Sequence, residues 1–130
     1  MLSLALGLLV MRLGVGLLMV VHGAQKLFGM FGGYGLKGTA GFFESLGFKP
    51  GVLFVVLAGL AEVLGGLLLA AGLLTPLAGL LIAGTMAVAI LTAHKGEKLI
   101  GGYELPLVYL VVGLGLALAG PGPWTLMSIL

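Results

Sequence analysis

The sequence contains no cysteine and no aspartate. Without cysteine, the chain forms no disulfide and offers no thiolate ligand for zinc or for an iron–sulfur cluster. Without aspartate, it cannot supply a Ser-His-Asp triad. Walker and dinucleotide-binding motifs are also missing, because the glycines lie in apolar stretches with no strand before them. Thiol, iron–sulfur and triad chemistry are therefore excluded within this chain.

Charge is also scarce. Only 8% of the 130 residues are charged, whereas 61% are hydrophobic. A water-soluble domain carries about a quarter charged residues to cover its surface. The composition therefore predicts a single domain, residues 1–130, that lies in the lipid bilayer. A net charge of +2 without a dense basic patch argues against a nucleic-acid partner.

Four apolar stretches are candidates for membrane-spanning helices, since a span needs about 20 helical residues. They predict an all-α fold, an integral membrane four-helix bundle, with spans at residues 2–24, 51–74, 77–93 and 105–119. Residues 38–48, between the first two spans, are too short to cross a membrane. They predict a short amphipathic helix that begins at Thr39, ends at Gly47 and has Phe42, Phe43 and Leu46 on one side.

Lysines occur only in two of the connections between the predicted spans. Lys26, Lys37 and Lys49 lie in or next to the first connection, and Lys95 and Lys98 lie in the third. In a chain with four spans, these two connections face the same compartment. The positive-inside rule then predicts a multi-pass protein with connections one and three in the cytoplasm and both termini outside.

Glycine is abundant, with 25 residues. In lipid, small residues allow helix backbones to approach closely. Glycines inside the spans therefore predict a tightly packed bundle, and those on its outer faces make a homo-oligomer plausible.

Two opposite charges, Arg12 and Glu62, lie near the centres of the first and second spans. An isolated charge there costs at least about 2.5 kcal/mol, so such residues face the bundle interior, pair or line water. The simplest arrangement is a buried ion pair between the two helices. The pair either only fixes the helix register or forms part of a functional site.

Further polar residues gather toward one membrane face. At 100° per residue, Lys26 lies about 40° and His22 about 80° from Arg12 around the first helix. His94 at the end of the third span, and Tyr103 and Glu104 at the start of the fourth, lie at the same face. A polar cavity that is open at one side indicates a ligand pocket more than a pore. The candidate ligand-binding residues are Arg12, His22, Lys26, Glu62, His94, Tyr103 and Glu104. As interfacial or loop residues, several of them could instead simply be solvated.

A cation, a carboxylate, histidine and tyrosine at membrane depth suit a lipophilic ligand with carbonyl or hydroxyl groups, such as a quinone. Two histidines alone are weak evidence for a bis-histidine haem, and too few ligands for zinc. The sequence thus predicts no metal site and no certain cofactor, with quinone as the favoured ligand.

Three ordered motifs resemble the DoxX family of small four-helix membrane proteins. They are Arg12 with residues 22–29 (HGAQKLFG), residues 38–48 (GTAGFFESLGF) and residues 61–69 (AEVLGGLLL). The resemblance covers roughly residues 8–93. It implies a plasma-membrane protein that is linked to redox complexes, and its signature residues fall on Arg12, His22, Gly23, Lys26, Glu62, Gly65 and Gly66.

Three functions remain open at this point. The first is a quinone- or lipid-binding subunit of a membrane oxidoreductase, with a soluble or membrane redox partner that completes catalysis. The second is a scaffold that recruits soluble redox enzymes, for which Lys37, Phe42, Phe43 and Glu44 would matter most. The third is a small proton-coupled transporter that depends on Glu62. Whether the chain is itself catalytic stays open.

Overall fold

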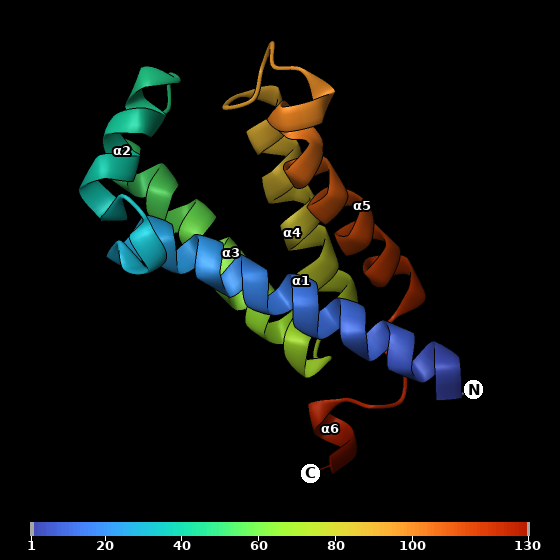
Figure 1. Ribbon diagram of the computed structural model, residues 1–130. Coiled ribbons are helices and arrows are strands. Elements are labelled where there is room, and N and C mark those ends of the chain that lie inside the picture. The colour runs from blue at the N-terminus through green and yellow to red at the C-terminus, as the bar shows by residue number, and fades with distance from the viewer. Residues whose placement is uncertain (1, 130) are drawn as a thin grey trace.

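The computed structural model describes residues 2–129, and every element among them is helical. The main helices, which are shown in Figure 1, are α1 (Leu2–Phe28), α2 (Gly35–Ser45), α3 (Gly51–Ala71), α4 (Thr75–Leu91) and α5 (Glu104–Ala119). Short helical turns, η1 (Met30–Gly32), η2 (Leu99–Tyr103) and α6 (Leu126–Ile129), lie in the connections and at the C-terminal end.

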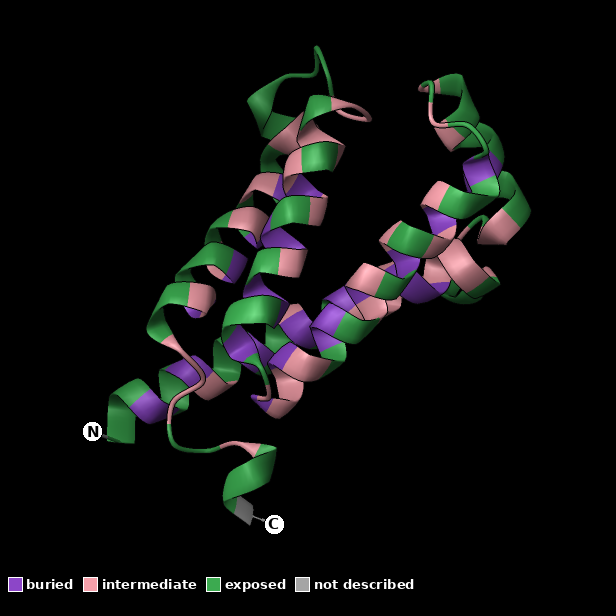
Figure 2. Cartoon of the chain, turned by 180° about the vertical axis from the view of Figure 1, so that it is seen from behind, coloured by how far each residue is buried: buried purple, intermediate pink, exposed green. Residues whose placement is uncertain are grey.

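Three helical segments, Leu2–Phe28, Gly51–Ala71 and Leu99–Ala119, are long and apolar enough to cross a membrane, and α4 is a shorter apolar helix of 17 residues. Leucine side chains on their outer faces are exposed, whereas buried residues face the neighbouring helices (Figure 2). The predicted all-α membrane helical bundle is therefore confirmed.

The ends of α3 and α4 differ slightly from the expected ones. Gly72 has φ of +75° and stops α3 at Ala71, because the left-handed conformation that glycine tolerates ends a helix. Pro76 lies in the first turn of α4, where its missing N–H costs nothing, so α4 begins at Thr75 instead of residue 77.

The helices form two arms that meet at one end of the molecule and diverge toward the other. In Figure 1, α1, α2 and α3 make one arm, and α4 and α5 make the second. Both termini and the α3–α4 turn lie at the closed end. The connection that carries α2 and the α4–α5 connection lie at the open end, so the lysine-bearing segments share one end of the bundle.

Glycines allow the backbones of α1 and α3 to touch. A Cβ atom on Gly16 would lie 2.6 Å from the carbonyl oxygen of Gly66, and one on Gly23 would lie 2.7 Å from that of Gly59. Such contacts permit the close approach that the glycine content predicts. By contrast, a Cβ atom on Gly14 meets nothing within 4 Å, so not every glycine serves packing.

Helix α2 begins earlier than the sequence predicts. It starts after Tyr34, and Thr39 is buried inside the helix instead of capping it. The cause is Gly35, whose φ of +74° turns the chain directly into the helix. The helix ends at Ser45, and Gly47 follows with a φ of +98°, close to the predicted end.

The hydrophobic core fills the closed end of the bundle. Its centre is made by Met19 of α1, Leu69 of α3, Ile82 of α4 and Leu116 of α5, all of which are almost completely buried. Because the core occupies the end where the arms meet, the space between the arms lies at the open end.

Candidate functional site

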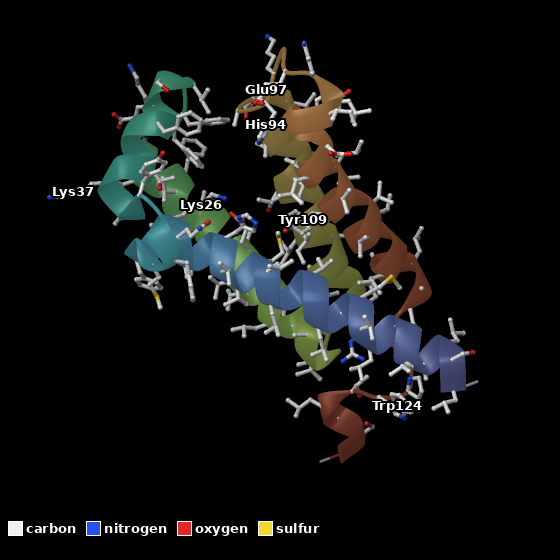
Figure 3. The ribbon with its side chains drawn as sticks, viewed as in Figure 1. Lys26, Lys37, His94, Glu97, Tyr109 and Trp124 are labelled. Atoms are coloured by element: carbon white, nitrogen blue, oxygen red, sulfur yellow. The ribbon has the colours of Figure 1, made fainter. Side chains whose placement is uncertain are left out.

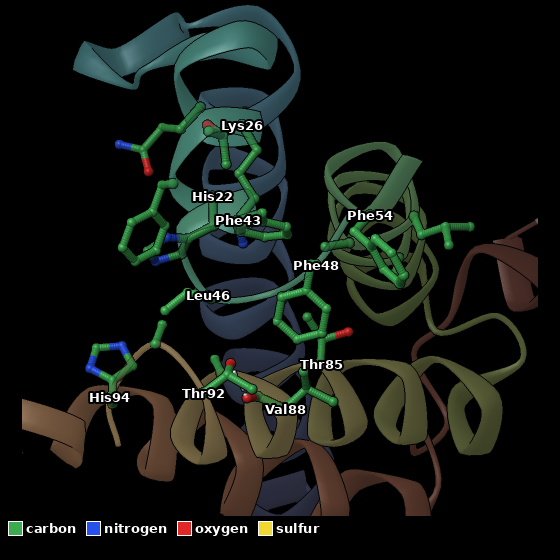
Figure 4. Close-up of a pocket in the computed structure, with 18 of the residues that line it drawn as sticks. His22, Lys26, Phe43, Leu46, Phe48, Phe54, Thr85, Val88, Thr92 and His94 are labelled. Atoms are coloured by element: carbon green, nitrogen blue, oxygen red, sulfur yellow. Dashed lines mark hydrogen bonds between the residues drawn. The ribbon is translucent and has the colours of Figure 1, made fainter. Parts of the chain in front are cut away.

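A cavity of about 740 Å³ occupies the open end between the two arms (Figure 4). Helices α1, α2, α3 and α4 all contribute to its wall. Its polar lining residues are His22, Gln25, Lys26, Thr39, Thr85, Thr92 and His94, and Tyr34 adds a phenol. Most of the remaining wall is apolar, so the cavity has the composition of a site for a lipophilic ligand with a few polar groups.

His22 and Lys26 bring polarity to the α1 side of the cavity. They are four residues apart, so they lie on one face of the helix, and both point toward the cavity in Figure 4. The His22 ring also contacts Tyr109 of α5 edge to face, with 5.6 Å between the ring centroids. This contact bridges α1 and α5 behind the cavity wall, since no residue of α5 lines the cavity.

Lys26 neutralises Glu62. Its ammonium group forms an ion pair with Glu62 Oε1, across the contact between α1 and α3. The Glu62 side chain is only 1% exposed and its Oε2 atom has no hydrogen-bond partner within residues 2–129, whereas the Lys26 side chain is 26% exposed. Lys26 therefore connects a buried carboxylate to the cavity.

Four phenylalanines form an aromatic wall opposite α4. Phe42 and Phe43 come from α2, Phe48 from the α2–α3 connection and Phe54 from α3. Successive ring centroids are 6.3, 6.0 and 5.2 Å apart, which is the range of favourable aromatic contacts. Phe42, Phe43 and Leu46 all line the cavity, so the predicted apolar side of α2 faces inward.

Helix α4 supplies the opposite wall. The Thr85 hydroxyl donates to the carbonyl of Leu81 at 2.7 Å, and the Thr92 hydroxyl donates to that of Val88 at 2.6 Å. Each oxygen keeps lone pairs that can accept a hydrogen bond from a ligand. Next to Thr85, the wall has no side chain at Gly84.

His94 lies at the outer rim of the cavity (Figures 3 and 4). Its Nδ1 atom is 2.9 Å from Glu97 Oε2, so part of its hydrogen-bonding capacity is used within the loop. His22 and His94 therefore both line this one cavity.

Tyr103 and Glu104 do not line the cavity, in contrast to the expectation. Helix α5 turns Tyr109 inward. Glu104 is five residues earlier and so lies about 140° around the helix from Tyr109. It is exposed on the outside of α5.

Arg12 does not pair with Glu62, so this part of the sequence prediction is wrong. Its guanidinium donates to the carbonyl oxygens of Leu69 (3.1 Å) and Ala70 (2.9 Å) in α3. It also donates to those of Pro121 (3.0 Å) and Trp124 (2.7 Å) in the C-terminal segment. Arg12 is only 1% exposed, as expected for a charge within a span, but its bond to Trp124, which is labelled in Figure 3, places it at the closed end of the bundle.

The register of α1 against α3 explains the separation. Because the helices are antiparallel and Gly16 lies against Gly66, Arg12 is level with Ala70. Glu62 is level with residue 20, eight residues or about 12 Å along the helix axis from Arg12. Arg12 borders a second, smaller cavity of about 340 Å³, which shares no lining residue with the first.

The ion pair makes a first prediction about stability. Lys26→Met is expected to lower the free energy of unfolding by about 3 kcal/mol, because it leaves the buried Glu62 carboxylate without its counterion. In the double variant Lys26→Met/Glu62→Gln, most of this loss is recovered. Unfolding in increasing SDS, measured for the wild type, both single variants and the double variant, gives the coupling energy. Strictly additive effects would contradict the pairing.

The fold and cavity define a class: a small helical membrane protein with a ligand-sized cavity at one end, polar on one helix and aromatic on another. The family model described as DoxX matches residues 7–95, and the chain belongs to the DoxX family. It is also 34% identical over 118 residues to a protein of Bacillus subtilis (strain 168) named "Putative oxidoreductase CatD". That match covers 91% of this chain and 82% of the relative. No solved structure matches the chain.

Proposed function

We propose that the protein is a quinone-binding membrane subunit of a redox-linked complex, and that the cavity between the two arms holds the quinone ring. The observation that carries this proposal is the combination of Lys26 and His22 with an aromatic wall in one cavity. A volume of about 740 Å³ falls in the range of small-molecule sites.

The lining residues match the chemistry of a quinone in both redox states. Lys26 uses one donor on Glu62 and has others that can reach a ligand carbonyl, where its charge would stabilise a reduced anion. His22 can donate or accept a proton, and Thr85 can accept a hydrogen bond from a hydroxyl. We place the electron donor in a partner protein. The name of the Bacillus relative supports an oxidoreductase setting.

The same proposal places the protein in the plasma membrane with the open end of the cavity toward the cytoplasm. The positions of Lys37, Lys49, Lys95 and Lys98 at that end support this orientation, since basic residues favour the cytoplasmic side.

Two other functions receive less support from the geometry. A scaffold that used the aromatic residues of α2 would have to share them with the cavity, because Phe42, although 48% exposed, and Phe43 both line it, and Glu44 accepts a hydrogen bond from the Gly51 N–H at 3.0 Å. A transporter would need a continuous polar path, whereas the two cavities at opposite ends share no lining residue.

A binding experiment with His22→Leu tests the proposal. The probe is a benzoquinone with a decyl tail, titrated into protein in lipid nanodiscs and followed by thermophoresis, with empty nanodiscs as the baseline. We expect His22→Leu to weaken binding about tenfold, since it removes one hydrogen bond at the ring. Tyr103→Leu serves as a control because Tyr103 lies outside the cavity, and it is expected to bind as the wild type does.

The outcomes separate the possibilities. If the wild type shows no binding above empty nanodiscs, the quinone proposal is wrong. If Tyr103→Leu weakens binding as much as His22→Leu does, the ligand does not sit in the cavity described above.

A further inference from the structure

We infer that the ligand carries a hydrocarbon tail, which leaves the cavity sideways between α3 and α4 and enters the bilayer. This inference rests on the proposed function and adds to it a tailed, membrane-dissolved class of quinone and a route of entry. Three observations support it: the level at which α3 and α4 separate, the exposure of the lining residues at that level, and the distribution of polarity across the cavity.

Helices α3 and α4 are in contact near the core and part above it. A Cβ atom on Gly65 of α3 would lie 3.5 Å from the Leu81 and Ile82 side chains of α4, an ordinary packing distance. At Gly84, about one turn further along α4, an added Cβ atom meets nothing within 4 Å. The gap between the two helices therefore begins within one turn, at the level of Gly84.

Residues that border this gap face the cavity and the outside of the bundle at once. Leu57 of α3 lines the cavity and is 55% exposed, and Leu80 and Val88 of α4 line it and are 55% and 52% exposed. In a membrane helix, exposed leucine and valine side chains contact acyl chains. The cavity is thus continuous with the lipid-facing surface between α3 and α4.

The other flank of the cavity differs. Here the His22 ring contacts Tyr109 of α5, so α1 and α5 are in contact on this side. The charged group of Lys26 also lies on the α1 side. The α3–α4 side has no charged lining residue: Leu57, Gly84 and Val88 lie there beside the Thr85 hydroxyl, which already donates to the Leu81 carbonyl. Charge therefore falls across the cavity, from α1 to the gap.

A ligand with a polar ring at one end and a hydrocarbon chain at the other matches this gradient. Its ring would lie against His22 and Lys26, and its chain would cover Leu57 and Val88. A tailless, water-soluble quinone would leave the apolar half unfilled. A lipid acyl chain alone would leave the donors of Lys26 and His22 unused.

Gly84→Leu tests the exit directly. The new side chain starts from an open position and fills the gap, so it blocks the chain without disturbing the packed core. Gly115→Leu is the matched control: an added Cβ atom there also meets nothing within 4 Å, and Gly115 does not line the cavity. Both proteins are titrated in nanodiscs with two probes that share one ring, a decyl-tailed benzoquinone and its methyl analogue.

We expect the wild type to bind the decyl probe at least tenfold more tightly than the methyl probe, after subtraction of partitioning into empty nanodiscs. Gly84→Leu should weaken binding of the decyl probe at least tenfold and that of the methyl probe less than threefold. Gly115→Leu should change neither.

Other results would overturn the inference. If Gly84→Leu weakens both probes equally, or neither, the chain does not leave by this gap, although ring binding and the proposed function still stand. If decanol displaces the tailed probe as effectively as unlabelled tailed quinone does, the gap binds any acyl chain and the cavity does not bind the quinone ring. If the wild type binds neither probe, the proposed function fails together with the inference.

Discussion

Arg12→Ala is expected to lower the free energy of unfolding by about 3 kcal/mol or more. The guanidinium donates to four carbonyl oxygens, two in the last turn of α3 and two in the C-terminal segment. A buried polar group that loses its partner costs about 1–3 kcal/mol. The Leu69 carbonyl also accepts from the Gly72 N–H at 3.1 Å, so the substitution affects the carbonyls of Ala70, Pro121 and Trp124 most. A cation at the end of a helix also offsets the negative end of the helix dipole. The substitution removes both effects.

Two comparisons make this prediction specific. Arg12→Lys keeps the charge but loses the planar fork that reaches several carbonyls at once, so it is expected to recover only part of the stability. Lys37→Ala removes an exposed charge of the same sign and should leave stability within about 0.5 kcal/mol. Unfolding in SDS measures all three variants. Equal stabilities of Arg12→Ala and Lys37→Ala would show that the carbonyl contacts contribute little.

The position of Arg12 also changes how ligand binding should be tested. If Arg12 bound the ligand, as its place among the candidate ligand-binding residues predicts, Arg12→Ala would abolish quinone binding while the bundle stays intact. In the structure, Arg12 holds the closed end together and lies apart from the cavity of His22 and Lys26. A loss of binding in Arg12→Ala would therefore report a damaged fold, and the residues at the open end are the ones to examine.

Much of the fold follows from hydropathy and charge placement. A residue such as Glu62 cannot face lipid without a large cost, so its burial could be predicted from the sequence alone. The inward face of α2, with Phe42 and Phe43, follows from helical periodicity in the same way. Both predictions concern one helix at a time, for which the sequence is informative.

The partner of Arg12 could not be predicted in this way, because helical periodicity gives the face of a residue and not its level against a neighbouring helix. The glycine spacing narrows that level but does not fix it. Gly16 and Gly23 are seven residues apart in α1, and Gly59 and Gly66 are seven apart in α3. In the structure these two pairs meet, which puts Arg12 opposite Ala70 and brings Lys26 within reach of Glu62. Gly7 and Gly14 are also seven residues apart, so the spacing allows more than one register.

Other parts of the site depend on how the two arms diverge. Phe48, Phe54 and Thr85 come from three separate segments, and no local pattern in the sequence links them. They line one cavity only because α3 and α4 separate toward the open end, starting from the contact of Gly65 with Leu81. Hydropathy is high on both sides of that point, so it does not report where two apolar helices part.

The crossing of α1 and α3 carries the second large prediction: Gly16→Val is expected to lower the free energy of unfolding by more than about 3 kcal/mol, beyond ordinary overpacking. A Cβ atom on Gly16 would lie 2.6 Å from the Gly66 carbonyl oxygen and 2.9 Å from the Ala70 nitrogen. Both are backbone atoms of a helix, so neither can move aside alone. Helix α3 as a whole must shift away from α1.

Such a shift would reach both ends of the molecule, since the Arg12 contacts lie on one side of the crossing and the Lys26–Glu62 ion pair lies on the other. Gly14→Val is the matched control: it changes the same helix by the same β-branched side chain, but a Cβ atom at Gly14 meets nothing within 4 Å. Helix propensity is therefore equal in the two variants, and only the contact with α3 differs. If SDS unfolding gives the two variants the same stability, backbone contact does not hold α1 against α3. If Gly16→Val alone loses stability and quinone binding together, the glycine crossing both holds the bundle together and positions Lys26 and His22 at the cavity.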